Sequence, residues 1–139
     1  MKKIMGIDYG DARTGVAVSD LLCSIVGTTT VIPSRNADKA LADLVRMASE
    51  QDVGTIVVGL PRNMDGSEGF RADRCREFAG LLRERLENIP IAMMDERMTT
   101  MSASRYLNET NTTGQKRKGV IDTLSAQIIL QNALDRLKN

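Results

Sequence analysis

The chain of 139 residues contains no histidine. This absence excludes Ser-His-Asp and Cys-His catalysis, histidine general bases and histidine metal ligands. Any hydrolytic chemistry must therefore use carboxylates, a metal ion or both. The two cysteines, Cys23 and Cys75, are too few and too far apart for a disulfide framework or a structural zinc site. Cys75 falls on the apolar stripe of a predicted helix, so we expect a buried thiol there.

Aromatic side chains are also scarce, with no tryptophan, two tyrosines and two phenylalanines. This composition argues against a stacking platform for single-stranded nucleic acid. The formal net charge of +1 gives no global basic field of the kind that many nucleic-acid-binding proteins carry. The basic residues gather instead in local clusters, at Arg71/Arg74/Arg76, Arg83/Arg85 and Lys116-Arg117-Lys118.

Long apolar runs are missing as well. No stretch approaches the length of a membrane span, and the first residues lack the charged-then-apolar layout of a signal peptide. We therefore expect a cytoplasmic protein with no membrane partner. The rest of the composition is globular, with 42% hydrophobic and 27% charged residues. The length fits one domain with one core, over residues 1–139.

Apolar periodicity predicts three strands, then a helix, a strand, a helix, a strand and two final helices. The strands are expected at residues 2–9, 14–19, 24–32, 55–60 and 89–94. The helices are expected at residues 36–50, 67–86, 99–109 and 120–137. Asn36 or Ser34 caps the first helix in this prediction, and Ser67 caps the second. Residues 110–119 contain no apolar side chain and are predicted to form a mobile basic loop.

This order of elements predicts an α/β fold built on a five-stranded mixed sheet with helices on both faces. The first three strands form an antiparallel meander, and the last two strands run parallel to the first. The right-handed crossover rule places residues 55–60 beside residues 2–9, since both are apolar central strands.

Acidic residues follow the strands that this topology brings to one edge of the sheet. Asp8 ends the first strand, Asp95 and Glu96 follow the fifth, and Asp122 lies in the first turns of the last helix. Ligands of open α/β sheets bind beyond the carboxyl ends of the parallel strands. Each acid also has a simpler explanation, because Asp122 would favour a helix N-terminus and Glu96 would pair with Arg97 or cap the helix at Thr99.

A cluster of Asp8, Glu96 and Asp122 has a specific chemical consequence. Carboxylates that are held close together raise one another's pKa, and a hard divalent cation relieves the repulsion. Oxygen ligands favour Mg²⁺ or Mn²⁺. Two such ions between these acids would support hydrolysis of a phosphodiester.

Four stretches together resemble the motifs of one family. They are Gly6-Ile7-Asp8-Tyr9-Gly10 with Arg13 and Gly15–Asp20, Gly59-Leu60-Pro61 with Asn63–Gly69, Asp95-Glu96-Arg97 with Thr99-Thr100, and Lys118-Gly119-Val120-Ile121-Asp122. On these residues the chain resembles the YqgF/RuvX family of the RNase H-like superfamily, over nearly its whole length. One departure is Asp11-Ala12, where the family often has a basic residue.

The resemblance implies an RNase H-like fold and an endonuclease that trims the 5′ end of the 16S ribosomal RNA precursor. It implies that Asp8 is shared by two metal ions and that Glu96 and Asp122 hold one ion each, with Asp95 as the alternative to Glu96. It also implies nucleic-acid contacts from Arg13, Arg62, Asn63, Ser67, Arg97, Thr99 and Lys118.

Three alternatives stay open at this stage. The first is a Holliday junction resolvase that cleaves branched DNA, a task that usually needs a two-fold dimer. In contrast to such a dimer, this chain is expected to be a monomer or a weak homodimer. The second is a nucleotide-binding module like those of actin and Hsp70, which share the Gly-Ile-Asp-x-Gly turn but close two lobes over ATP. The third is a non-catalytic factor that assembles the small ribosomal subunit.

Overall fold

The computed structural model describes residues 2–95 and 114–138, and the side chains of this range except those of 114–122 and 138. Five strands form one mixed sheet in the order β3-β2-β1-β4-β5. The strands are β1 (Lys3–Asp8), β2 (Arg13–Ser19), β3 (Val26–Pro33), β4 (Val53–Leu60) and β5 (Ile91–Asp95). Strands β1, β2 and β3 pair antiparallel, whereas β4 runs parallel to both β1 and β5. The predicted fold class, the meander and the position of the fourth strand beside the first are confirmed.

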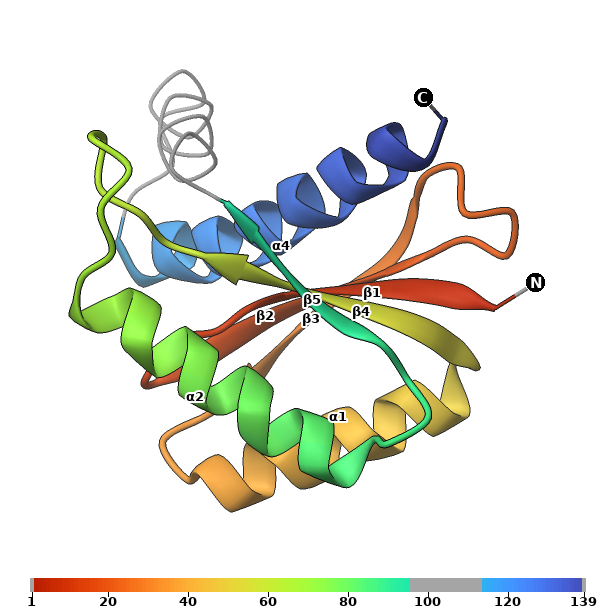
Figure 1. Cartoon of the computed structure of the whole chain (residues 1–139), viewed down its shortest axis with the longest axis horizontal. Helices are drawn as coiled ribbons and strands as arrows, with labels where there is room; N and C mark the ends of the chain where they lie inside the picture. The colour runs from red at the N-terminus through yellow and green to blue at the C-terminus, as the bar shows by residue number, and fades with distance from the viewer. Residues whose placement is uncertain (1, 96–113, 139) are drawn as a thin grey trace.

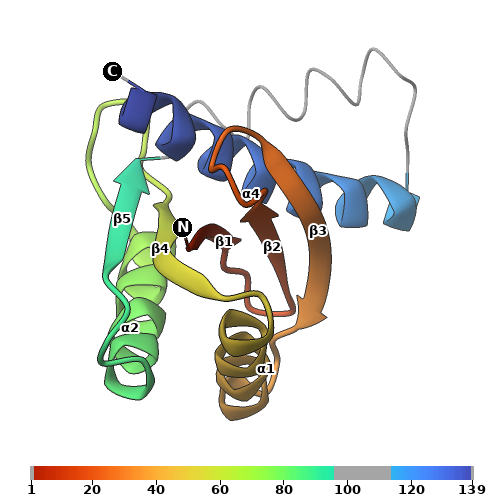
Figure 2. The same ribbon diagram turned by 90° about the vertical axis from the view of Figure 1, so that its right-hand side faces the viewer.

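Helices cover both faces of the sheet. Helices α1 (Ala37–Glu50) and α2 (Phe70–Arg85) lie on one face, and α4 (Gly114–Lys138) crosses the other (Figures 1 and 2). Because side chains alternate along a strand, the apolar residues divide into two cores. Met5, Ile7 and Val58 belong to the core under α1 and α2, and Ile4 and Val57 to the core under α4. Strands β1 and β4 serve both cores, which explains their continuous apolar runs.

Helix α4 lies very close to β1 because small residues meet at the contact. A Cβ atom on Gly6 would lie 2.9 Å from Leu130 Cβ and 3.2 Å from the carbonyl oxygen of Ala126. Helical spacing in the sequence predicts that Ile121, Leu124, Ser125, Ile128 and Leu134 face inward, but of the four whose side chains are described only Ser125 and Leu134 are buried. The buried residues among the described side chains of α4 are Ser125, Ala126, Ile129, Leu130, Ala133 and Leu134. The sheet-facing stripe uses alanines where the prediction chose larger side chains.

The cap of the first helix agrees with the sequence, and that of the second does not. Asn36 caps α1 by accepting a 3.1 Å hydrogen bond from the Lys39 amide. Ser67 does not cap α2, because that helix begins at Phe70 after Gly69 and has no side-chain cap. The Ser67 hydroxyl is bonded instead to the Asp65 carboxylate, at 2.6 Å. This bond closes a turn ahead of the helix.

The last helix starts earlier than predicted. Residues 114–119 belong to α4 and not to a loop. Gln115, Lys116, Arg117 and Lys118 all have good helix propensity, so a polar sequence does not prevent the packed helix from extending by these turns. The predicted helix at 99–109 and residues 110–113 lie outside the described residues. In the described part of the chain, no helix combines the length and apolar content that crossing a membrane requires.

Candidate functional site

Asp8 is the last residue of β1, and its side chain lies on the α4 face of the sheet. Ile4 belongs to the core under α4, and Gly6 touches that helix, so strand alternation gives Asp8 the same face. Asp8 is opposite Gly15 in the β1–β2 pairing. On the other side of β1, the last β1–β4 pair is Ile7 with Val58, so the next residue of β4, Gly59, lies beside Asp8. The residues directly opposite this half-buried carboxylate on both neighbouring strands are therefore glycines.

The turn after Asp8 is fixed by hydrogen bonds. The Ser34 side chain, which is 2% exposed, donates to the Gly10 carbonyl, and the Ser34 amide donates to the Ala12 carbonyl at 3.0 Å. A Cβ atom on Gly10 would collide with the Arg13 carbonyl oxygen, so the tight turn requires glycine. Arg13, the first residue of β2, points to the same face of the strand as Gly15 and Ala17. Its side chain therefore lies on the α4 face together with Asp8.

Asp122 and Lys118 lie in α4, and only their backbone is described. Asp122 is one helical turn before Ala126, whose carbonyl oxygen lies against Gly6. Gly6 is two residues before Asp8 on the same face of β1. Residue 122 therefore belongs to the turn of α4 that precedes the contact with β1, and Lys118 to the turn before that.

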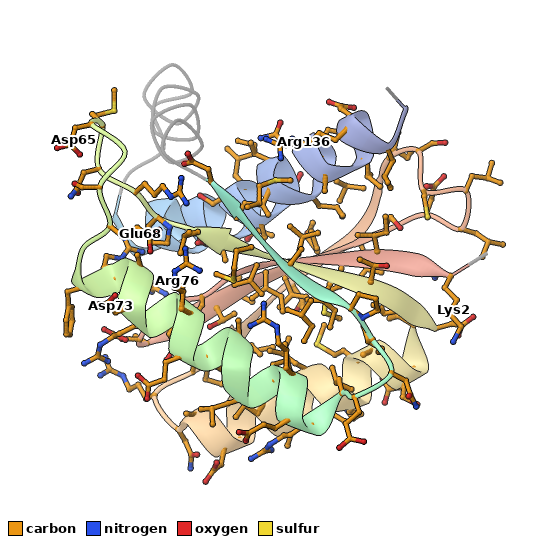
Figure 3. All side chains as sticks on the ribbon, in the orientation of Figure 1. Lys2, Asp65, Glu68, Asp73, Arg76 and Arg136 are labelled. Carbon is orange, nitrogen blue, oxygen red and sulfur yellow. The ribbon has the colours of Figure 1, made fainter. Side chains whose placement is uncertain are left out.

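The segment between β4 and α2 forms a short exposed hairpin. Arg62 and Glu68 make an antiparallel bridge, and the Asn63 amide donates to the Ser67 carbonyl at 2.9 Å. Gly66 occupies the left-handed region, with φ of 89°, which a tight turn requires here. The side chains of Asn63 and Ser67, both predicted to contact substrate, are exposed and bonded to each other at 2.9 Å. Figure 3 shows this hairpin, with Asp65 near its tip, projecting beyond the end of the sheet.

Arg62 is part of an ion-pair network. Its guanidinium lies 3.3 Å from Glu68 Oε2 and 3.8 Å from Asp95 Oδ2. Arg76 of α2 donates two hydrogen bonds of 2.8 Å to Glu68 (Figure 3). The hydrogen bonding from Arg76, together with the charges of Arg76 and Arg62, lowers the pKa of Glu68. The same contact with Glu68 raises the pKa of Arg76.

Asp95 lies on the opposite face of the sheet from Asp8. Met94 belongs to the core under α4, and Met93 packs against the core under α1 and α2. Asp95 is two residues after Met93 on the same strand, so both side chains point to the same face; its partner on β4 is Leu60. Its ion pair with Arg62 is consistent with this side of the sheet.

The remaining predicted site residues lie outside the described residues. Glu96, Arg97 and Thr99 fall in the stretch from 96 to 113. Among the described side chains, no three acidic or thiol groups gather in a way that would hold a metal ion. The described side chains include that of Asp8 but neither that of Glu96 nor that of Asp122. The structure thus brings Asp8 and Arg13 to one face, adds the first turns of α4 on that face, and separates Asp95 from them.

The sequence analysis assigned no role to Glu68 or Arg76. The one indication of this ion pair in the sequence is the spacing of eight residues, which puts Glu68 before the helix and Arg76 in its second turn. Such spacing is common between solvated side chains, so it did not single out an ion pair.

A groove of about 710 Å³ lies on the α1/α2 face of the sheet. Its walls include Tyr9, Arg35, Phe70 and Arg74. The Tyr9 ring stacks on Phe78 with centroids 4.2 Å apart. Burial, and secondarily the charge of Asp11, raise the pKa of Tyr9. Asp8 is not among the described residues that line this groove.

Comparison with known proteins identifies the family. Residues 2–136 match the family RuvX, described as Holliday junction resolvase. A Halothermothrix orenii protein is 42% identical over 96% of this chain and 94% of its own length, and a Staphylococcus haemolyticus protein is 43% identical over 98% and 97%. Both relatives are provisionally named as pre-16S rRNA nucleases.

Solved structures agree with this assignment at the level of the fold. Thermus thermophilus RuvC in complex with a Holliday junction aligns with a TM-score of 0.63 and 9% identity, over 99% of this chain and 96% of that one. The fowlpox virus resolvase in complex with Holliday junction DNA aligns with a TM-score of 0.60 and 9% identity, over 99% of each chain. The fold is therefore RNase H-like, and the chain belongs to the RuvX family.

Proposed function

We propose that this protein is a metal-dependent endonuclease that hydrolyses phosphodiester bonds in the 5′-end processing of the 16S ribosomal RNA precursor. The names of its relatives supply the reaction class and the substrate. The observation that carries the proposal is the carboxylate of Asp8, which ends a central strand on the same face as Arg13 and the early turns of α4.

The donor set fits a hard divalent cation. Asp8, Glu96 and Asp122 offer only carboxylate oxygens, and the chain has no histidine. Mg²⁺ and Mn²⁺ prefer such ligands. When bound, a pair of these ions would supply a hydroxide nucleophile and stabilise the leaving oxygen. The protein's own contribution is to hold three acids at fixed positions.

Glu96 is favoured over Asp95 as the third acid. Asp95 lies on the α1/α2 face and is paired with Arg62. We therefore assign metal binding to Asp8, Glu96 and Asp122.

Arg13 is proposed as a phosphate contact because its side chain lies on the same face of the sheet as Asp8 and follows a turn that hydrogen bonds hold in place. Lys118, Arg97, Thr99, Asn63 and Ser67 remain proposed contacts from the resemblance. Such contacts would fix the register of the substrate without reading its sequence.

A Holliday junction is the second candidate substrate, since the matching family is described as a Holliday junction resolvase. The deciding experiment incubates the protein with Mg²⁺ or Mn²⁺ and two substrates side by side. One is a 16S precursor fragment with its 5′ extension, and the other is a four-way DNA junction. We expect metal-dependent cleavage of the RNA by the wild type and none by Asp8→Asn, Glu96→Gln or Asp122→Asn.

Three other results, from this assay and from separate experiments, would reject parts of the proposal. Cleavage of the junction alone would replace the substrate and retain the chemistry. Normal ribosome maturation in cells that carry only Asp8→Asn would indicate a non-catalytic assembly factor. Tight ATP binding by the wild type would favour a nucleotide-binding module.

A further inference from the structure

Four charged side chains from three different segments form one continuous network. Arg62 follows β4, Glu68 closes the hairpin, Arg76 comes from α2, and Asp95 ends β5. Glu68 lies between the two guanidinium groups, with the two Arg76 hydrogen bonds at 2.8 Å and Arg62 at 3.3 Å. Arg62 then reaches Asp95 at 3.8 Å. The network thus connects α2 to the end of β5.

The charges of this network balance. Two arginines face two carboxylates, and removal of the Glu68 charge would leave two guanidinium groups next to each other. The side chain of Arg62 is one-third exposed, and its Nε atom is buried with no hydrogen-bond partner in the described part of the chain. Its position therefore depends on the contacts of its terminal nitrogens with Glu68 and Asp95.

These contacts argue against a primary role for Arg62 in phosphate binding. Both of its terminal nitrogens already face a carboxylate, so a phosphate would have to displace one of them. The contacts are also on the α2 side of the sheet, whereas Asp8 and Arg13 are on the α4 side.

We propose that Glu68 and Arg76 are positioning residues, which hold Arg62 against Asp95 and so fix the end of β5, from which the chain continues into Glu96. Arg62 accordingly acts through Asp95 and not as a substrate contact. The inference rests on the proposed function, because it treats Glu96 as a metal ligand. Misplacement of a catalytic group by a change far from the chemistry can cost up to about 100-fold in rate.

The test uses the whole protein with the variants Glu68→Gln, Arg76→Gln and Arg76→Lys. Arg85→Gln is the matched control, since Arg85 lies on the same helix and pairs with an exposed acid, Asp38, at 3.1 Å. Amide hydrogen exchange is measured for β5 in the free protein. Cleavage rate, affinity and the salt dependence of affinity are measured with the 16S precursor fragment.

The two Gln variants are expected to exchange faster at Met94 and Asp95 and to lose about tenfold in kcat. Their RNA affinity and its salt dependence should equal those of the wild type. Arg76→Lys should fall in between, because it keeps the charge but loses the paired hydrogen bonds. Arg85→Gln should match the wild type in every measurement.

Two results would overturn the proposal. Wild-type exchange at the end of β5 in both Gln variants would mean that the network does not hold this strand. Normal kcat together with a weaker salt dependence would mean that these arginines contact phosphate. If the wild type cleaves no substrate at all, the proposed function fails, and the exchange measurement still decides whether the network fixes β5.

Discussion

Asp8 and Asp95 end two parallel strands at the same edge of the sheet, yet their side chains lie on opposite faces. Asp8 points to the same face of β1 as Ile4 and Gly6, and that face is covered by α4. Asp95 has the alternation of Met93 and is paired with Arg62 on the α2 side. Only one of these two carboxylates is on the side where the first turns of α4 approach β1.

This relationship predicts different effects of two isosteric substitutions on metal binding. Asp8→Asn should weaken Mn²⁺ binding by more than about a hundredfold, since it removes a proposed direct ligand, a larger effect than outer partners show. Asp95→Asn should weaken it by no more than about tenfold, through the position of β5. Titration with Mn²⁺, followed by electron paramagnetic resonance, measures both. Equal losses in the two variants would contradict the assignment of Glu96 over Asp95.

The close approach of α4 to β1 predicts a stability effect at Gly6. Gly6→Ala would place a Cβ atom 2.9 Å from Leu130 Cβ and should lower the free energy of unfolding by about 1–3 kcal/mol. Chemical denaturation measures this change. Gly80→Ala is the control, because Gly80 is in helix α2 and, apart from its own helix backbone, no described atom lies within 4 Å of an added Cβ. It should stabilise the protein by about 0.5–1 kcal/mol; destabilisation by both substitutions would contradict this account of the contact.

The Glu68 ion pairs predict a pH dependence of stability. Arg76 hydrogen bonding lowers the pKa of Glu68 in the folded protein below its ordinary value of 4.5. A lowered folded-state pKa stabilises the protein above the unfolded-state pKa, and this contribution is lost as the pH falls through the folded-state value. Wild type and Glu68→Gln should therefore differ most in unfolding free energy at neutral pH and converge in acid below pH 4.5. A difference that does not change between neutral and acidic pH would exclude an electrostatic origin.

The position of Arg13 predicts an effect on nucleic-acid affinity. Arg13→Gln should weaken RNA binding equally for different sequences and reduce the slope of log affinity against log salt by about 0.7–0.9. Arg46→Gln is the control, since Arg46 is exposed on α1 and paired with Asp43 and Glu50 on the other side of the sheet. Fluorescence anisotropy at several salt concentrations measures both slopes. An unchanged slope for Arg13→Gln would remove Arg13 from the phosphate contacts.

The sequence predicted the topology well because the strongest signals in it are local. The apolar runs of β1 and β4 identify central strands, and the handedness of the crossover then fixes their order. Asn36 identified the start of α1 for the same reason, since a cap depends on a few neighbouring residues.

The errors and open choices depend on contacts between distant residues. The face that Asp95 takes depends on the register of β5 on β4, which the sequence alone does not give. Ser67 has the composition of a cap but is bonded to Asp65 in the hairpin. The inward stripe of α4 includes Ala126 because Gly6 lets the helix approach β1, and nothing near Ala126 in the sequence indicates that contact.

We propose above all that Asp8, Glu96 and Asp122 bind divalent cations together. Anomalous diffraction from crystals grown with Mn²⁺ tests it most directly, because the peaks locate the ions relative to each carboxylate. We expect peaks within about 2.0–2.3 Å of oxygens from all three residues, with Asp8 shared between neighbouring ions. Well-ordered carboxylates of Asp8, Glu96 and Asp122 that are too far apart to share ions, or Mn²⁺ bound at Asp95 in their place, would contradict it.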